Sequence, residues 1–279
     1  MTAFRALLNP TGHFAAGQQL MHVLSRHRQL TWEMTKRELQ ERYAGQMLGT
    51  VWTLGHPLLL MALYVFVFGY VFRIRIGVDA TGGDYAMYLL AGIIPWIAFQ
   101  EAMTKGTTVI VQNAALVKQV VFPVEILPVK GVLASVFTEL VCLAVLLAYV
   151  IWRDALNVMW VLLPILLAFQ ALAMIGVCYV VASVGVFFRD IKDIVTVFTV
   201  AGLYLMPALY APGMVPKTFE ALFWLNPFSH MVWCFQDIVY FRRFAHPEAW
   251  IVFPLLSVVV FYLGFRIFRK LRPMFGNVL

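Results

Sequence analysis

The sequence predicts an all-α integral membrane protein with six transmembrane helices, and two observations lead to that prediction. The composition is 62% hydrophobic and only 13% charged over 279 residues, with a mean hydropathy of +0.83. A soluble domain of this composition would leave a large apolar surface in water. The second observation is that apolar segments of about 20 residues, long enough to cross a bilayer, recur along the chain. One membrane domain over 1–279 is therefore expected.

Six segments have the required length and apolar character: 50–72, 85–104, 126–152, 157–187, 193–210 and 249–268. The fifth ends in a proline-containing stretch, LMPALYAPG. Together they form a predicted membrane domain over 50–268, between an N-terminal region (1–49) and a tail (269–279). Most of the 21 Lys and Arg residues flank these segments at the N-terminus, in the loops after the second and fourth, and at the C-terminus. Because cytoplasmic loops are enriched in Lys and Arg, both termini are expected in the cytoplasm.

A charged helix is predicted immediately before the first span. Its apolar residues fall on one helical stripe, and its charges cover the other faces: the stripe is Trp32, Leu39, Tyr43 and Met47, and the charges are Glu33, Lys36, Arg37, Glu38, Glu41 and Arg42. The spacing allows the pairs Glu33–Arg37, Arg37–Glu41 and Glu38–Arg42. Such a helix suits the membrane interface, either as an anchor for the first span or as a docking surface. Its mixed charge favours docking of a cytoplasmic partner.

The segment 211–248 is apolar but broken. It contains FEALFWLNPFSHMVWCFQDIVY, and Pro227 interrupts any helix because it lacks a backbone donor and restrains Asn226. We expect two short re-entrant helices on the outer side, between the fifth and sixth spans, that meet near Asn226. Re-entrant backbone requires surrounding protein or a water-filled cavity. The alternative is an external loop that lies on the bilayer surface.

Catalytic and ligand-binding patterns are missing from the sequence. There is no GxxxxGK[ST] phosphate-binding loop and no HExxH or GxSxG motif. The cysteines (Cys142, Cys178 and Cys234) lie apart in apolar runs, as buried small hydrophobic residues do. No catalytic, cofactor-binding or metal site is therefore predicted, and the dispersed basic residues do not indicate nucleic acid. The ionisable residues Glu101, Lys130 and Glu139 are expected towards the ends of their spans.

An ordered set of motifs carries a family resemblance: RELQERYAGQMLGTVWTLGHPLLLMALYVFVFGYVF (37–72), GIIPW (92–96), NAALVKQVVFPVEILPV (113–129), FFRDIKDI (187–194) and LNPFSHMVWCFQDIVY (225–240). Over about 25–279 the chain resembles the permeases of type-2 ABC exporters of polysaccharides. The O-antigen export permeases are the most similar branch, and those for capsule and teichoic acid are related.

The resemblance implies a homodimeric permease of the bacterial cytoplasmic (inner) membrane that pairs with two ATP-binding subunits. It would export a lipid-linked polysaccharide for lipopolysaccharide biosynthesis, with ATP and Mg bound by the partner and no cofactor in this chain. The resemblance also implies three functional regions. They are an interface helix at about 28–46 (Arg37, Glu38, Glu41 and Arg42), a coupling helix in Asn113–Pro123 (Leu116, Val117, Lys118 and Gln119), and an outer gate at Asn226 and Pro227.

Two further groups of residues are candidates. The cytoplasmic turn of Arg189, Asp190, Lys192 and Asp193 places opposite charges close enough to pair, either as an ordinary polar loop or to transmit ATPase motion. Aromatic side chains can stack on sugar rings, and the channel candidates are Tyr64, Phe68, Tyr204 and Trp224. Lipid-facing or packing roles are the alternative for aromatics. Two alternative functions remain, a permease for drugs or small lipids and a non-transporting membrane enzyme or scaffold. A neighbouring ATPase gene would favour a transport function, and the absence of one would favour a non-transporting enzyme or scaffold.

Overall fold

The computed structural model describes residues 25–41, 51–72, 85–118, 122–154, 156–210 and 213–279. Regular structure in these residues is entirely helical. The elements are α3 (Arg28–Glu41), α4 (Val51–Tyr64), η1 (Val65–Val71), α5 (Tyr85–Gly106), α6 (Val109–Gln112), α7 (Ala114–Val117), α8 (Ile126–Trp152), η2 (Val158–Leu162), α9 (Leu163–Phe187), α10 (Ile191–Tyr204), α11 (Lys217–Leu225), α12 (Pro227–Gln236), η3 (Asp237–Phe241) and α13 (Ala249–Val278).

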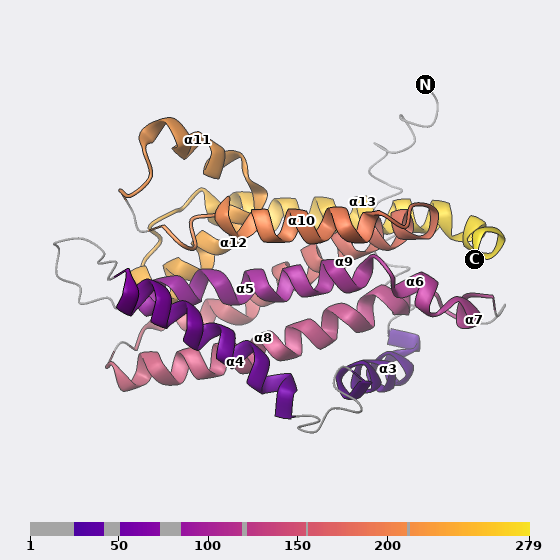
Figure 1. Cartoon of the computed structure of the whole chain (residues 1–279), viewed down its shortest axis with the longest axis horizontal. Helices are drawn as coiled ribbons and strands as arrows, with labels where there is room; N and C mark the ends of the chain where they lie inside the picture. Colours follow the sequence, from indigo (N-terminus) through magenta and orange to yellow (C-terminus); the bar gives the residue numbers. More distant parts are fainter. Residues whose placement is uncertain (1–24, 42–50, 73–84, 119–121, 155, 211–212) are drawn as a thin grey trace.

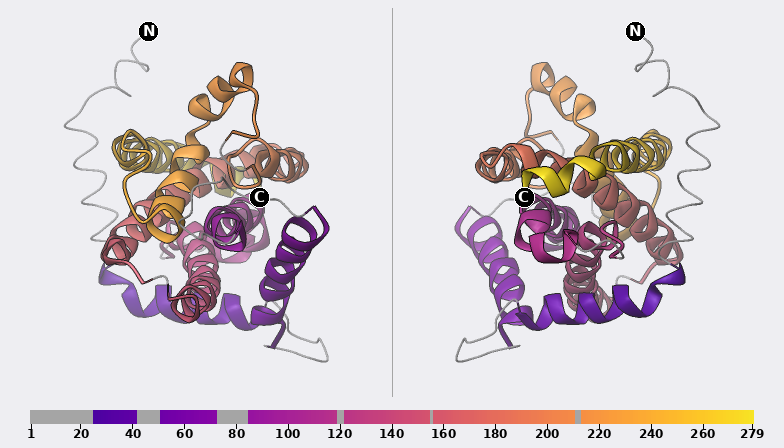
Figure 2. Two further views of the ribbon diagram at one scale, coloured as in Figure 1. Left: turned by 90° about the vertical axis from the view of Figure 1, so that its left-hand side faces the viewer. Right: turned by 90° about the vertical axis from the view of Figure 1, so that its right-hand side faces the viewer.

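The long helices form a bundle along the longest axis of the molecule (Figure 1). Seen along that axis, α3 lies across the bundle rather than along it (Figure 2). Helices α3, α6, α7 and the end of α13 lie at one end, whereas α11 stands away from the bundle at the other (Figure 1). The segments predicted to be cytoplasmic therefore gather at one end, opposite α11.

Four of the described helices are long and apolar enough to cross a membrane: Tyr85–Gly106, Ile126–Trp152, Val158–Phe187 and Ala249–Val278. They coincide with the second, third, fourth and sixth predicted spans. The first span corresponds to α4 and the π-helical η1, which follow each other directly. The fifth is shorter than expected, because α10 has 14 residues. At 1.5 Å per residue it extends about 21 Å, less than the roughly 30 Å hydrocarbon core.

Helix α10 ends where the chain turns through a buried, non-helical segment, 205–210. Side chains from other elements donate hydrogen bonds to four carbonyl groups of this segment. Tyr85 Oη donates to Leu209 O (2.8 Å), and Tyr88 Oη lies 2.9 Å from Pro207 O and 2.8 Å from Tyr210 O. Gln236 Nε2 also donates to Pro207 O (2.9 Å), and Asn226 Nδ2 donates to Leu205 O (2.8 Å). Irregular backbone in a membrane domain needs such partners because lipid supplies none. The fifth predicted span (193–210) thus ends as a helix at Tyr204, before the proline-containing stretch LMPALYAPG.

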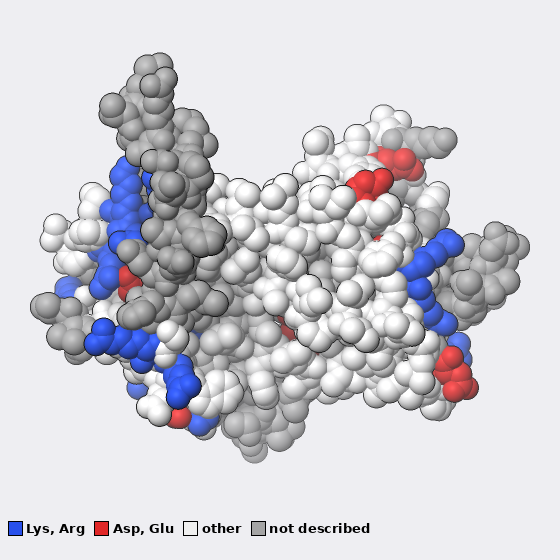
Figure 3. All heavy atoms as spheres, turned by 180° about the vertical axis from the view of Figure 1, so that it is seen from behind, with Lys and Arg blue, Asp and Glu red and all other residues white. Residues whose placement is uncertain are grey.

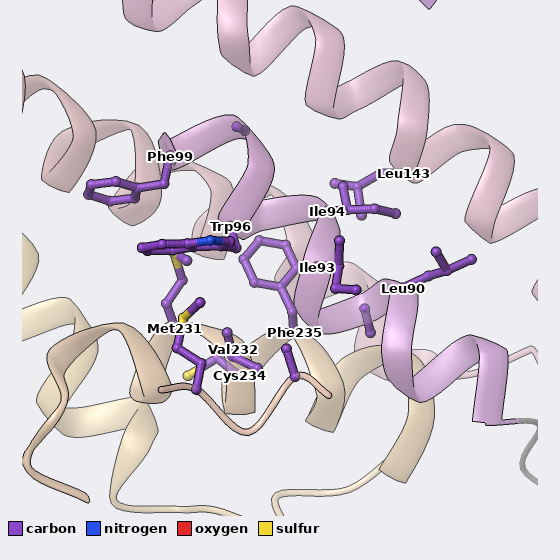
Figure 4. Packing of buried hydrophobic residues seen from close by; sticks show 14 of the residues in the cluster. Leu90, Ile93, Ile94, Trp96, Phe99, Leu143, Met231, Val232, Cys234 and Phe235 are labelled. Atoms are coloured by element: carbon purple, nitrogen blue, oxygen red, sulfur yellow. The ribbon is translucent and has the colours of Figure 1, made fainter. Parts of the chain in front are cut away.

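The core is centred on α5, which is buried along most of its length. Trp96 is fully buried and lies against Gly202 of α10, where an added Cβ would come within 2.6 Å of the indole. Phe228 packs edge-on against both Trp96 and Phe99, with ring centroids 5.2 and 5.1 Å away. Figure 4 shows Trp96 and Phe99 facing Met231 and its neighbours on α12. Helix α12 is thus part of the core rather than a surface loop.

Helices α9 and α13 approach each other closely at two glycines. A Cβ on Gly264 would lie 2.0 Å from the carbonyl oxygen of Gly176, and a Cβ on Gly176 would lie 2.6 Å from Phe261 Cα. Small residues at a crossing let helix backbones come into direct contact, which is how helices pack in lipid without a hydrophobic driving force. The crossing fixes α13 against α9 near the middle of both helices.

Glu139 lies at the middle of α8, not towards its end, which corrects the sequence interpretation. Its side chain is 2% exposed. Gln170 Nε2 of α9 donates to Glu139 Oε2 at 3.0 Å and to the carbonyl of Pro95 in α5 at 3.2 Å. The amide of Gln170 therefore links α5, α8 and α9. Its hydrogen bond to Glu139 takes the place of the water that this carboxyl group would contact if it lay near the end of the span.

Candidate functional site

Helix α3 is held to the bundle by Glu38. Its carboxylate contacts Lys130 of α8 at 3.1 Å and Lys105 of α5 at 3.4 Å, and Lys105 also contacts Glu101 at 3.2 Å. The side chains of Glu38 and Lys130 are only 21% and 9% exposed. This group of four charges, called the α3 clamp below, joins the interface helix to two predicted spans. The sequence placed Glu38 on the docking surface, but in the structure it faces the bundle.

The buried face of α3 is formed by Thr31 and Thr35. Their hydroxyls donate to the carbonyls of His27 (3.1 Å) and Thr31 (2.8 Å), one turn earlier in the same helix. Each buried hydroxyl is therefore satisfied locally, so this face packs against α8 without needing polar partners there. Trp32, from the predicted apolar stripe, is 53% exposed on the outside of the helix. Trp32 is thus free to contact lipid, whereas Tyr43 and Met47 of the stripe lie outside the described residues.

The exposed side of α3 carries the remaining docking candidates. Arg37 Nε contacts Glu41 Oε1 at 2.6 Å, as its spacing predicted. Glu33 pairs with Lys36 at 3.0 Å instead of with Arg37. Arg42, the fourth docking candidate, lies outside the described residues.

The α3 clamp also changes the electrostatics of its residues. Burial alone would raise the pKa of Glu38, but attraction to Lys105 and Lys130 outweighs it, so the pKa lies below its ordinary value. On the exposed side, the hydrogen bond and charge of Glu41 raise the pKa of Arg37. Both residues are therefore charged at neutral pH, one inside the contact between helices and one in solvent.

The predicted coupling helix is a single turn, α7, directly after α6. Leu116 and Val117 are half-buried, Lys118 is exposed, and Gln119 lies outside the described residues. The end of α13 packs nearby, with Phe275 fully buried, so most of the predicted tail continues this helix. Arg272 Nη1 contacts Glu125 Oε1 at 2.5 Å and fixes α13 to the start of α8.

The turn between α9 and α10, predicted to be cytoplasmic, is exposed. Arg189 and Asp190 form the turn, and Lys192 and Asp193 belong to the first turn of α10. Of the ion pairs in the described part of the chain, none joins these four residues. Their expected pairing is wrong, and all four charges point to solvent.

The four aromatic channel candidates lie in two places. Tyr64 stacks on Phe68 along α4 and η1, with centroids 6.4 Å apart, and lies close enough to Tyr204 of α10 for an electrostatic interaction. Trp224 belongs to α11 and packs against Trp233 at 4.7 Å instead. Tyr204 and Trp224 are 57% and 43% exposed. Tyr64, Phe68 and Tyr204 thus lie near one another, and Trp224 lies on α11, at the end of the bundle opposite α3 and α7 (Figure 1).

The break at Asn226–Pro227 is confirmed. Helix α11 ends at Leu225 and α12 begins at Pro227, the first-turn position where a missing donor costs nothing. Asn226 caps α12, because its side-chain oxygen accepts a hydrogen bond from Phe228 N at 3.0 Å. Helix α12 is buried from Ser229 to Gln236, whereas most of α11 is exposed. The break at Asn226 and Pro227 therefore separates the buried helix α12 from the exposed helix α11.

Sequence reasoning missed one buried polar network at the same end. Asp237 is fully buried and accepts hydrogen bonds from His246 Nδ1 (2.8 Å), His246 N (3.1 Å) and Trp250 Nε1 (3.0 Å). His246 also stacks on Trp233, with an interplanar angle of 7°. An acid within an otherwise apolar helix was the available signal. The network ties η3 to the start of α13.

Charged side chains are confined mainly to the two ends of the molecule. On the face shown in Figure 3, Lys and Arg gather at one end over the described residues, with a smaller mixed group at the other. Few charged atoms appear between them. This separation is what a bilayer requires of a multi-helix bundle, because charges inside lipid are expensive.

The bundle, its transverse helix α3 and its buried helix α12 define a multi-helix membrane protein. The ABC-2 type transporter family matches residues 29–240, so the chain belongs to that family. Its curated relatives include the O-antigen export system permease protein RfbA of Myxococcus xanthus, 28% identical over 267 residues, which are 93% of this chain and 98% of the relative. RfbA of Klebsiella pneumoniae is 26% identical over 248 residues, covering 88% and 93%. The chain is thus a permease of this family, related over most of its length to O-antigen export permeases.

Proposed function

We propose that this chain is the transmembrane subunit of an ATP-driven exporter. It moves a lipid-linked, O-antigen-like polysaccharide across the bacterial cytoplasmic membrane, through a channel formed by two copies of the chain. The observation that carries the proposal is the α3 clamp, which fixes a transverse, charged helix to α5 and α8. A helix attached in this way can transmit movement from a cytoplasmic partner into the bundle. The names of the relatives support the glycan as cargo.

In this proposal, two ATP-binding subunits bind ATP and Mg and dock at the end that carries α3 and α7. Arg37 and Glu41 supply exposed charges on α3, and Lys118 supplies one beside α7. The exposed turn at Arg189 and Asp190 lies between α9 and α10 and completes this surface. Glu38 acts here as a positioning residue, because its carboxylate already contacts two lysines.

The topology of the proposal has six spans and both termini in the cytoplasm. The segment Val51–Val71 is one helical run through α4 and η1, long enough to cross. The short α10 and the buried segment after it together reach the outer end, where α12 inserts as a re-entrant helix. The gathering of α3, α7 and the end of α13 at one end supports this arrangement.

Deletion of the gene tests the function. The deletion strain is expected to lose its surface glycan and to accumulate lipid-linked glycan inside, and a plasmid copy of the gene should restore the surface glycan. Immunodetection on intact and permeabilised cells separates the two pools. Normal surface glycan in the deletion strain would contradict the proposal. If the strain instead becomes sensitive to drugs with its glycan unchanged, the second candidate, a permease for drugs or small lipids, is correct.

A further inference from the structure

A polar groove opens between α4 and α5 within the predicted membrane region. It encloses about 1000 Å³, including its open mouth, and is lined by His56, Pro57, Leu60, Tyr64, Ile97, Gln100, Glu101, Thr104, Lys105 and Thr138. The polar residues of α5 recur at spacings of one and four, so they occupy one face of the helix. Polar side chains on a membrane helix are expensive unless they face protein, water or a ligand. The groove therefore has the character of a binding site rather than of a lipid-facing surface.

The charges of the groove disfavour an anionic ligand. Among the described residues that line it, Lys105 is the only lysine or arginine, and this lysine contacts Glu101 at 3.2 Å and Glu38 at 3.4 Å. A phosphate group would have to approach an ammonium that two carboxylates already neutralise. Gln100, Thr104 and Glu101 instead offer amide, hydroxyl and carboxylate groups, which hydrogen-bond neutral hydroxyls. Tyr64 adds an aromatic ring on which an apolar sugar face can stack.

A small polar cavity adjoins the groove. This cavity of about 10 Å³, room for about one water molecule, shares Glu101 and Thr138 with the groove and is also lined by Ser135 and Glu139. These two side chains are 0% and 2% exposed. Ser135 Oγ and Glu139 Oε1 have no hydrogen-bond partner among the described residues. Buried oxygens without partners are rare in proteins, and two beside a cavity of this size indicate that a water molecule binds there, next to the groove.

We propose that this groove binds a neutral sugar unit of the exported glycan on its way into the channel. The inference rests on the proposed function and adds the residues that hold the sugar. The headgroup of phosphatidylglycerol offers similar hydroxyls, so the test must separate a glycan from a lipid headgroup. Glu101 and Lys105 belong to the α3 clamp as well, and substitutions are therefore better made at Gln100 and Thr104.

Photolabelling of the full-length chain in phosphatidylcholine nanodiscs tests the proposal. The probe is a dodecyl maltoside that carries a diazirine on its sugar, and labelled peptides are mapped by mass spectrometry. The expected labels fall on α4 and α5, and soluble maltoheptaose should compete them away. Neither phosphatidylglycerol nor dodecyl phosphate should compete. The double variant Gln100→Leu, Thr104→Val should lower labelling about fivefold or more, because it removes two hydrogen-bonding groups.

Thr196→Val is the matched control, since Thr196 Oγ1 also donates to its own helix (Lys192 O, 2.9 Å), as Thr104 does (Gln100 O, 2.9 Å), but lies away from the groove. This control should label as the wild type does. Unchanged labelling of the double variant, or competition by phosphatidylglycerol or dodecyl phosphate, would overturn the proposal. The deletion strain distinguishes a failure of the groove assignment from a failure of the proposed export function. If that strain loses its surface glycan while the groove fails to label, only the groove assignment is wrong.

Discussion

At the scale of single residues, Glu38 illustrates how far a helical pattern can be interpreted. The charges at 33–42 predicted an amphipathic helix correctly, and the Arg37–Glu41 pair formed as its spacing suggests. Which charge faces inward depends on Lys105 and Lys130, which are distant in sequence and enter the contact only through the fold. Periodicity within one helix contains no information about them. Glu38 was therefore placed on the docking surface, although it holds the helix in place.

The α3 clamp predicts an asymmetry between acidic residues of one helix. Glu38→Gln leaves the nearly buried Lys130 without its counter-charge, and we expect the free energy of unfolding to fall by about 1–3 kcal/mol. Glu41→Gln is the control, because its pair with Arg37 is exposed and solvent screens the interaction, so this variant should change stability little. Denaturant unfolding in detergent measures both variants. Equal effects would contradict the inward role of Glu38.

The same carboxylate predicts a pH dependence. The pKa of Glu38 is lowered in the folded chain, so its stabilisation is complete above its ordinary pKa of 4.5 and is lost as the pH falls through the folded value. The stability difference between wild type and Glu38→Gln should therefore be constant near neutral pH and shrink below about pH 4.5. Unfolding measured over a pH series checks this. If the stability difference between wild type and Glu38→Gln grows as the pH falls, the stabilising role of the Glu38 carboxylate is contradicted.

At the scale of elements, the boundaries that depend on local chemistry were predicted well. Proline and asparagine fixed the joint between α11 and α12. The length of α10 was not predictable, because 205–210 is apolar enough to extend the span. Its backbone is non-helical only because side chains from α5, α12 and Asn226 satisfy its carbonyls. A hydropathy profile contains no information about hydrogen-bond partners on other helices.

The crossing of α9 and α13 provides a prediction for elements. Gly264→Ala places a Cβ 2.0 Å from a backbone oxygen that cannot rotate away, so the helices must separate. We expect a loss of about 1–3 kcal/mol in unfolding free energy. Gly131→Ala, where an added Cβ meets nothing within 4 Å, should be neutral or stabilising by about 0.5–1 kcal/mol. Similar stability of the two variants would show that the crossing is not tight.

At the scale of the whole molecule, composition and ordered motifs predicted the helical membrane class and the family, both of which are confirmed. Each motif is a short run of consecutive residues, so the motifs and their order can be identified from the sequence alone. Glu139 was misplaced because its Gln170 partner lies on another helix, and the groove between α4 and α5 exists only through the tertiary arrangement. Contacts between spans were therefore the part that the sequence left open.

Docking of the ATP-binding subunit gives a prediction at this scale. Exchanging the charges of one pair, Arg37→Glu with Glu41→Arg, keeps attraction within α3 but reverses what the partner meets. We expect co-purification of the ATP-binding subunit to fall about tenfold, equivalent to about 1.4 kcal/mol. The matched exchange Glu33→Lys with Lys36→Glu should have little effect. Undiminished co-purification of the first variant would remove Arg37 and Glu41 from the docking surface.

The central claim, that this chain moves a glycan with energy from a separate ATPase, is tested most directly in inverted membrane vesicles. Vesicles containing the chain and its ATP-binding subunit are supplied with lipid-linked glycan and ATP, and glycan protected from an added glycosidase is measured. The account predicts protection only when both subunits and hydrolysable ATP are present. Protection without this chain, or at the same rate without ATP, would contradict it.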